Sequence, residues 1–200
     1  METARPGRSR SEASRLAILE ATRDELVERG YDKLSLERIA AAAGVGKQTI
    51  YRWYPSKSAL VAEGVLHGHL MDHIDLPDTG DIRADLTHWL MAFAGAGPES
   101  DSAALIRATS AATAEDETVA ARYEEQVTVV VRTALRARLT AGMEVGQVRR
   151  DAPVTAVVES LVGTVLFRVL TRQPVSAEFV ADLVSLLFSG IGGSDSTPRV

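Results

Sequence analysis

The chain has 200 residues, 46% of them hydrophobic, which suits one domain or two small ones with a buried core. It contains no cysteine, so disulfides and thiolate metal sites are excluded, and no apolar run approaches the ~20 residues that a membrane span needs. Aromatic residues are few and strand-like alternation is nearly absent, so we expect an all-α protein. Because the first fifteen residues are polar and lack the apolar stretch of a signal peptide, we expect it to be cytoplasmic.

The formal net charge of −5 is unevenly distributed along the chain. Residues 1–60 carry 11 Lys and Arg against 8 Asp and Glu, a net charge of +3, and residues 61–200 carry 11 against 19, a net charge of −8. This asymmetry suggests an anion-binding N-terminal end on an acidic body, although random scatter explains the counts equally well. Whether particular residues cluster in the sequence must decide between these two explanations of the charge asymmetry.

The first third of the chain predicts a helix-turn-helix layout, in which two short helices around a glycine turn have a longer helix on either side. An apolar stripe between residues 15 and 29 predicts the first helix, which Gly30 ends as a C′ residue. Ser35 is expected to cap the second helix, and Gly44 allows the positive φ that the tight turn before the third requires. Ser56 is expected to cap the fourth, which runs to about Ile74.

The third helix, from about residue 46 to residue 54, is expected to expose a crowded set of polar and aromatic side chains. Lys and Arg bind guanine edges or phosphates, Gln binds adenine, and hydroxyl groups bind phosphate oxygens. Lys57 adds a cation beside the N–H groups that begin the fourth helix. A solvated helix face would also be rich in Lys and Arg, but it would seldom contain three aromatic residues in four positions. The residues predicted to contact DNA are Ser35, Lys47, Gln48, Thr49, Tyr51, Arg52, Trp53 and Lys57.

Residues 11–60 resemble the N-terminal domain of the TetR/AcrR family of bacterial transcriptional regulators. The resemblance lies in "GYDKLSLERIAAAAGVGKQTIYRWYPSKSALV" and is strongest at Gly44-Val45, at Thr49-Ile50-Tyr51 and at Lys57. It implies a three-helix DNA-binding head on a larger all-helical body that dimerises and binds an inducer.

The same resemblance implies separate roles for the residues of the third helix. Thr49, Tyr51 and Lys57 stand where the family contacts phosphates. The residues at positions that face the major groove are Lys47, Gln48 and Arg52. One departure is Trp53-Tyr54-Pro55, which stands where the family commonly has His-Phe, so Trp53 either contacts the sugar–phosphate backbone or packs against the protein.

The rest of the chain predicts further helices over residues 82–94, 102–113, 116–141, 154–170 and 176–188, about nine in all. We therefore expect a flexible arm at 1–10, a helix-turn-helix domain at 11–58, a ligand-binding and dimerisation domain at 59–190, and a disordered tail at 191–200. The arginines of the arm either reach along DNA or are simply solvated, and the sequence does not decide between these.

Two sets of residues in the body are candidates for binding. An effector pocket would have apolar walls with a few polar groups, whereas ordinary helix packing would use the same residues. The pocket candidates are Trp89, Phe93, Arg107, Tyr123 and Phe167. The last two helices are apolar over more than one face, which favours burial against a symmetry mate over the core of a monomer. The predicted dimer interface comprises Val158, Leu161, Val162, Val165, Phe179, Leu183, Leu186 and Leu187.

Catalytic and metal-binding patterns are missing from the sequence. It has no phosphate-binding glycine loop, no HExxH and no Gly-x-Ser-x-Gly elbow, so we expect neither an enzyme nor a cofactor. His69 and His73 have the i, i+4 spacing that can bind zinc, but nothing nearby completes the site and His67 points nearly opposite His69. We therefore predict no metal site.

These observations favour a ligand-responsive transcriptional regulator, most readily a repressor. It would bind a palindromic operator in double-stranded DNA as a homodimer, and a small-molecule effector of unknown identity would release it. The alternatives are an architectural DNA-binding protein without an inducer and, less favoured, a helical enzyme with a DNA-binding head.

Overall fold

The computed structural model describes residues 6–66, 76–94 and 100–189, and the chain divides into two compact units. Unit 1 comprises residues 1–73 and 98–130, and unit 2 comprises residues 74–97 and 131–200. Within these described ranges every regular element is helical, which confirms the all-α prediction. None of the described helices combines the length and hydropathy that crossing a membrane would require.

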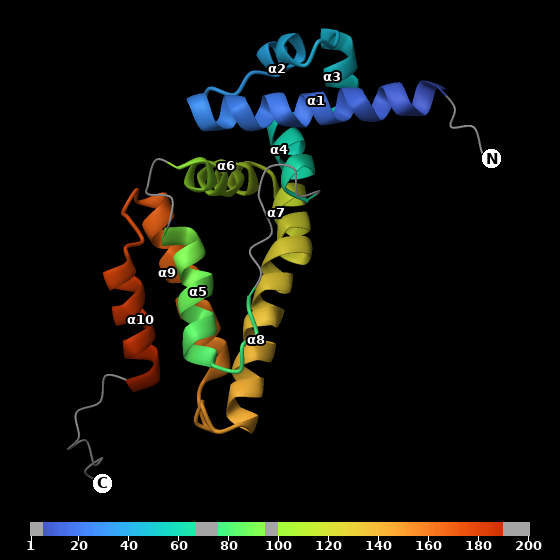
Figure 1. Ribbon diagram of the computed structural model, residues 1–200. Coiled ribbons are helices and arrows are strands. Elements are labelled where there is room, and N and C mark those ends of the chain that lie inside the picture. Colours follow the sequence, from blue (N-terminus) through green and yellow to red (C-terminus); the bar gives the residue numbers. More distant parts are fainter. Residues whose placement is uncertain (1–5, 67–75, 95–99, 190–200) are drawn as a thin grey trace. The chain divides into compact units, whose positions relative to one another are not determined.

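The N-terminal helices of unit 1 form a helix-turn-helix arrangement. They are α1 (Pro6–Arg29), α2 (Leu36–Ala42), α3 (Lys47–Trp53) and α4 (Lys57–Leu66). Helix α2 packs against α1 and α3, and α4 packs against α1 from the opposite side (Figure 1). Both predicted N-caps are confirmed, since Ser35 Oγ accepts from the N–H of Arg38 and Ser56 Oγ accepts from the N–H of Ala59 at 3.1 Å.

Helix α1 begins earlier than the sequence suggested, because it includes residues 6–10 of the segment predicted to be a flexible arm. Proline is well tolerated in the first turn of a helix, where its missing N–H has no partner to lose. The helix is therefore free to start at Pro6 rather than close to residue 15.

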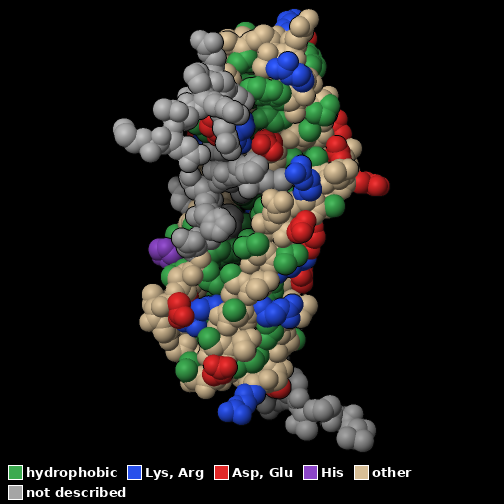
Figure 2. Space-filling view, turned by 90° about the vertical axis from the view of Figure 1, so that its right-hand side faces the viewer, with side chains coloured by type: hydrophobic (Ala, Val, Ile, Leu, Met, Phe, Trp, Pro, Cys, Tyr) green, Lys and Arg blue, Asp and Glu red, His purple; other side chains and the backbone are tan. Residues whose placement is uncertain are grey.

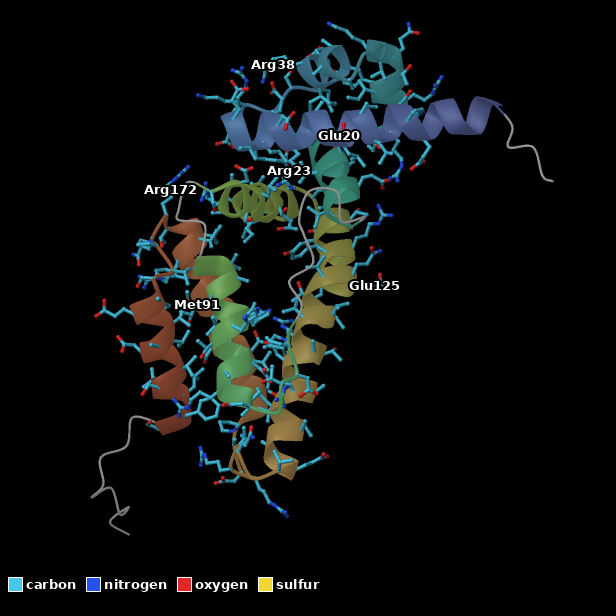
Figure 3. The ribbon with its side chains drawn as sticks, in the orientation of Figure 1. Glu20, Arg23, Arg38, Met91, Glu125 and Arg172 are labelled. Atoms are coloured by element: carbon cyan, nitrogen blue, oxygen red, sulfur yellow. The ribbon has the colours of Figure 1, made fainter. Side chains whose placement is uncertain are left out.

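Two further helices complete unit 1, α6 (Asp101–Glu115) and α7 (Glu117–Tyr123). Helix α6 packs against α1 and α4, and α7 packs against α4 and α6. Leu60 and Val61 on α4 meet Leu105 and Ala112 on α6 in one buried cluster. Arg23 on α1 lies toward α6, and its guanidinium is 4.0 Å from Asp101 (Figure 3). The helix-turn-helix and α6–α7 therefore share a single hydrophobic core.

A short π segment, η1 (Glu124–Thr128), separates α7 from α8 (Val129–Glu144). The sequence predicted one continuous helix over residues 116–141, so the structure interrupts it with one turn of a different hydrogen-bonding pattern. When α7, η1 and α8 are counted as one helix, the described residues form the nine helices expected.

Unit 2 contains α5 (Ile82–Ala94), most of α8, α9 (Val154–Leu170) and α10 (Ala177–Ser189). Helix α5 packs against α10, where the Arg83 guanidinium lies 4.5 Å from the ring centroid of Phe188 (Figure 1). Arg136 on α8 donates to Thr155 on α9 at 3.0 Å. The buried side chains of this unit include Leu86, Trp89, Leu90, Leu135, Leu139, Val158, Leu161, Val165, Val180 and Val184.

A buried ion pair joins α5 to α8. Arg138 Nε donates to Asp85 Oδ2 at 2.8 Å, and the Thr79 hydroxyl donates to Asp85 Oδ1 at 2.7 Å. Burial raises the pKa of Asp85, but the hydrogen bonds from Thr79 and Arg138 outweigh it and hold that pKa below its usual value. The loop before α5 is therefore held in place by Asp85 on α5, which is itself paired with Arg138 on α8.

Figure 2 shows the face of unit 2 that carries α8. Acidic, basic and hydrophobic side chains are interspersed on it. Such a mixture of charges is typical of a solvated surface rather than of a surface that binds a polyanion.

Candidate nucleic-acid interface

The turn between α2 and α3 fixes how α3 is presented. Gly44 has φ +65°, in the left-handed region that glycine adopts without strain. Its N–H donates to the carbonyl of Ala41 at 3.2 Å, and the N–H of Val45 donates to the carbonyl of Ala40 at 2.9 Å. These bonds satisfy carbonyls at the end of α2 and let α3 begin at Lys47, three residues after Gly44.

One side of α3 faces the core and the other faces solvent. Ile50 is fully buried, whereas Lys47, Gln48 and Arg52 are exposed and Tyr51 is 46% exposed. Thr49, on the flank of the helix, is half-buried. The donors that the sequence predicted for DNA thus lie together on the outer side of one short helix.

Lys57, predicted as a phosphate contact, lies in the first turn of α4 and is half-buried. Its ammonium group is 4.3 Å from the ring centroid of Tyr31 and 3.8 Å from the carboxylate of Glu115 at the end of α6. The Tyr31 hydroxyl also donates to Glu115. Burial and this neighbouring carboxylate raise the pKa of Tyr31 strongly, so it stays a neutral donor.

Trp53 at the end of α3 packs against the protein more than it projects outward. It is half-buried against the core and lines a shallow groove with Arg15, Tyr54 and Glu63. An ion pair of 3.2 Å between Arg15 and Glu63 ties α1 to α4 beside it. Of the two roles that the sequence left open for Trp53, packing is the one that these contacts support.

Glu37 is a residue of this surface that the sequence did not single out as a contact. Its carboxylate accepts from the Ser35 hydroxyl at 3.2 Å and from the Tyr51 hydroxyl at 3.3 Å, and it lies 3.9 Å from the ammonium of Lys47. The hydrogen bonds from Ser35 and Tyr51, together with Lys47, lower the pKa of Glu37. An ionised carboxylate therefore sits at the edge of an otherwise cationic and neutral surface.

The predicted pocket residues divide between the two units. Arg107 and Tyr123 belong to unit 1, Trp89 and Phe167 belong to unit 2, and the side chain of Phe93 lies outside the described residues. Tyr123 borders a cavity of about 10 Å³ between α4, α6 and α7, which has room for about one water molecule. Trp89 is buried, whereas Phe167 is 61% exposed. Within either unit, these residues do not surround a cavity of effector size in the part of the chain that the structure describes.

The predicted dimer residues also fall into two classes. Half of them are already buried within a single chain, namely Val158, Leu161, Val165 and Leu183. The others are half-buried or exposed, namely Val162, Phe179, Leu186 and Leu187. Other large hydrophobic side chains on α9 are also exposed, and they are Leu166, Phe167 and Leu170.

The three histidines considered for zinc, at positions 67, 69 and 73, lie outside the described residues. Within the described ranges, no group of three or more His, Cys, Asp and Glu side chains is arranged to hold a metal ion.

Comparison with known proteins decides the family. Residues 18–63 match the family described as bacterial regulatory proteins, tetR family, and residues 76–187 match the tetracyclin repressor-like C-terminal domain. The uncharacterized HTH-type transcriptional regulator YdeS of Bacillus subtilis (strain 168) is 30% identical over 195 residues, which is 96% of both chains. The chain belongs to the TetR family.

Other TetR-family proteins agree with this assignment. The DNA-binding transcriptional repressor TetR of Mycobacteroides abscessus is 35% identical over 79 residues, 39% of this chain and 41% of that protein. The crystal structure of the TetR family transcription regulator SCO0332 is 34% identical, with a TM-score of 0.68 over 90% of this chain and 99% of its own. These relatives are transcriptional regulators rather than enzymes, and the chain is accordingly a DNA-binding transcriptional regulator.

A more distant structure shares the TetR fold. The transcriptional regulator FadR of Bacillus subtilis, solved in complex with stearoyl-CoA, is 18% identical, with a TM-score of 0.64 over 88% of this chain and 99% of its own. At this identity the likeness concerns the fold alone.

Proposed function

We propose that this TetR-family regulator is a cytoplasmic repressor that binds a palindromic operator as a homodimer and is released by a small-molecule effector. Residues 11–58 would bind the DNA, and residues 59–190 would provide the effector site and the dimer contact. The observation that carries the proposal is the outward face of α3, where Lys47, Gln48 and Arg52 are exposed directly above the buried Ile50.

The side chains on α3 and its neighbours suit different parts of a duplex. Lys47, Gln48 and Arg52 would face base edges in the major groove, since Lys and Arg bind guanine and Gln binds adenine. Hydroxyl and ammonium groups around them would hold phosphates and set the register of the helix. These phosphate contacts would come from Ser35, Thr49, Tyr51 and Lys57.

The dimer contact would use the apolar surface that α9 and α10 leave exposed. Phe167 and Leu170 on α9 are 61% and 46% exposed, and Leu186 on α10 is 47% exposed. Among the described residues, nothing beyond the backbone of α9 and the chain neighbours of Gly163 lies within 4 Å of where a Cβ would stand on it, so another helix could approach α9 closely there. Val162, Phe179 and Leu187 would contribute from its edges, while Val158, Leu161, Val165 and Leu183 would support the surface from beneath.

The effector would bind in the C-terminal region and favour a conformation in which the two heads no longer match the operator. A ligand shifts such an equilibrium only by the difference between its affinities for the two conformations. The predicted contacts stay a proposal for each unit by itself, with Arg107 and Tyr123 in unit 1 and Trp89 and Phe93 in unit 2, whereas Phe167 fits the dimer surface better because of its exposure.

A selection experiment tests the DNA-binding part of this proposal. The full chain is incubated with a library of random double-stranded DNA, and the bound sequences are recovered and read. We expect a palindrome whose half-sites lie about 10 base pairs apart or a multiple of this, with two protomers per duplex in sedimentation. A single unrepeated site, or one protomer per duplex, would contradict the proposal.

The effector is tested with the same duplex. Small molecules, including long-chain acyl-CoA thioesters because of the ligand in FadR, are screened for stabilisation in thermal unfolding. A compound that both stabilises the protein and releases the operator supports the proposal. Stabilisers that never release DNA would instead favour an architectural protein.

A further inference from the structure

Glu37 stands out on the proposed DNA-binding surface because its charge has the wrong sign for that place. It is the second residue of α2, its side chain is 49% exposed, and the α3 residues nearest to it carry an ammonium group and a phenol. A carboxylate so close to phosphates weakens binding to any duplex through repulsion. The helix dipole favours a carboxylate in the first turn of α2, but the side chain of Glu37 also reaches α3.

The contacts of Glu37 indicate what role it has there. Oε1 accepts from Tyr51 at 3.3 Å and lies 3.9 Å from Lys47 Nζ, so one oxygen faces two side chains that are four residues apart on the same side of α3. Oε2 accepts from Ser35, the N-cap of α2, which fixes the carboxylate in position. Glu37 thus connects the start of α2 to the DNA-facing side of α3.

The neighbouring Arg38 makes its ion pair with another carboxylate, and its interaction with Glu37 is a weaker one through charge alone. Its guanidinium pairs with Glu25 on α1 at 2.8 Å and also donates to the carbonyl of Lys33 (Figure 3). Among the described residues, Lys47 is the cation that lies within ion-pair distance of Glu37, at 3.9 Å. The charge of Glu37 therefore acts on Lys47.

Lysine alone is a poor discriminator between base edges and phosphates. Its ammonium group is a point charge with three donors at the end of a flexible chain, and it binds either kind of acceptor. The Glu37 carboxylate, 3.9 Å away, attracts this ammonium group by charge without a direct hydrogen bond, so the lysine donors stay available for DNA. The same carboxylate cancels the net charge that would otherwise bind phosphates without regard to sequence.

We propose that Glu37 is a positioning residue that determines specificity: it restrains Lys47 and Tyr51, and it weakens binding to non-operator DNA more than binding to the operator. This inference rests on the proposed function, since it requires α3 to bind DNA through Lys47. In the free protein the exposed pair contributes little to stability. Its effect belongs to the complex, where DNA displaces water and the pair is less screened.

The test compares Glu37→Gln with the unchanged chain on two duplexes of equal length, the selected operator and a scrambled sequence, by fluorescence anisotropy. Glutamine keeps an acceptor oxygen for Tyr51 but removes the charge. We expect Glu37→Gln to bind the scrambled duplex roughly five- to tenfold more tightly, and the magnitude of the salt slope on that duplex to rise by about one unit. The ratio of the two affinities should fall by a similar factor.

Two further variants separate this role from a general charge effect. Glu20→Gln removes the same charge from an exposed position on α1 (Figure 3), and we expect it to leave the affinity ratio unchanged. In a Lys47→Ala background, Glu37→Gln should no longer change the affinity ratio, because its effect acts through Lys47. Thermal unfolding verifies that each variant is folded.

The outcomes distinguish this inference from the proposed function. The inference would be overturned if Glu37→Gln left the affinity ratio unchanged, or if it changed that ratio equally in the unchanged chain and in the Lys47→Ala background. Either result would leave the proposal of DNA binding intact. If the unchanged chain bound every duplex equally, or none, the proposed function itself would fail.

Discussion

Asp85 is the most completely buried carboxylate among the described residues, and its surroundings explain why it is tolerated. Its side chain has no exposed surface, and its oxygens accept from the guanidinium of Arg138 and from the hydroxyl and N–H of Thr79. A buried charge without partners would be very costly, whereas pairing and hydrogen bonds offset much of that desolvation cost. The loop before α5 depends on this group.

Replacing Asp85 by Asn should destabilise the protein by about 2 kcal/mol, because the guanidinium of Arg138 loses its buried counterion and keeps only the exposed carboxylate of Asp78, 3.3 Å away. Chemical unfolding at neutral pH measures this change. Asp182→Asn, at an exposed position on α10, is the control and should change the free energy of unfolding by less than about 0.5 kcal/mol.

The same carboxylate predicts a pH dependence. Its pKa is lower in the folded chain than the value of about 3.9 expected when unfolded. Its contribution is therefore fully present above that pH and is lost as the pH falls through the folded pKa. The stability difference between the unchanged chain and Asp85→Asn should accordingly shrink below about pH 4. A difference that stays constant down to pH 2 would contradict this.

Lys57 permits a second test at the level of one residue. Lys57→Ala should weaken binding to all duplexes alike and lower the magnitude of the salt slope by about one unit, as expected for a phosphate contact. The change should also lower thermal stability slightly, because the ammonium group lies over Tyr31. Arg149→Ala removes the same charge from unit 2 and should leave the slope unchanged. A loss confined to particular base pairs would assign Lys57 to base recognition instead.

Some of these residue roles were visible in the sequence and others were not. The types and spacing of Lys47, Gln48 and Arg52 predicted an exposed polar face on α3, and the structure has it. A glutamate in the first turn of a helix is common for dipole reasons alone, so nothing marked Glu37 as a partner of Tyr51, fourteen residues away. Contacts of this kind depend on how two helices pack against each other. The periodicity of apolar residues in the sequence does not specify that packing.

Among the elements, those with clear start and stop signals were predicted well. Helices α5 and α9 have the bounds expected from the sequence, 82–94 and 154–170. The π segment after α7 was missed, since it changes the hydrogen-bonding pattern without changing the composition. The apolar residues of α9 cover more than one face, and a sequence does not tell which of these faces its own chain covers.

The turn between α2 and α3 gives a prediction at this scale. In the part of the chain that the structure describes, a Cβ on Gly44 would meet no atom within 4 Å apart from its chain neighbours, so any effect of substitution arises from the positive φ rather than from collision. Gly44→Val should therefore destabilise the chain by about 1–2 kcal/mol, and Gly44→Asn by less, because asparagine tolerates this conformation. Thermal unfolding measures both, and equal losses would show that the backbone conformation is not the cause.

For the whole molecule, the exposed residues of α9 and α10 define where a second copy would bind. Phe167 and Leu170 are exposed in the single chain, so Phe167→Glu with Leu170→Glu should leave it folded. We expect this double variant to sediment as a monomer and to lose operator binding, because a monomer has one DNA-binding head and cannot contact the second half-site.

The matched control for this experiment replaces two exposed valines elsewhere. Val129→Glu with Val130→Glu introduces the same charges on α8, and we expect the dimer to persist. A dimer that survives both double variants at micromolar concentration would place the contact on another surface.

The shared core of α1, α4 and α6 has a consequence for modularity. Leu60 and Val61 are completely buried in a cluster that includes Leu105 and Ala112 of α6, and unit 1 unites residues 1–73 with residues 98–130. A fragment cut after α4 would therefore expose apolar surface that the full chain covers. Chimaeric regulators that transplant this helix-turn-helix onto a foreign body would have to bring α6 and α7 with it, or redesign the surface beneath α4.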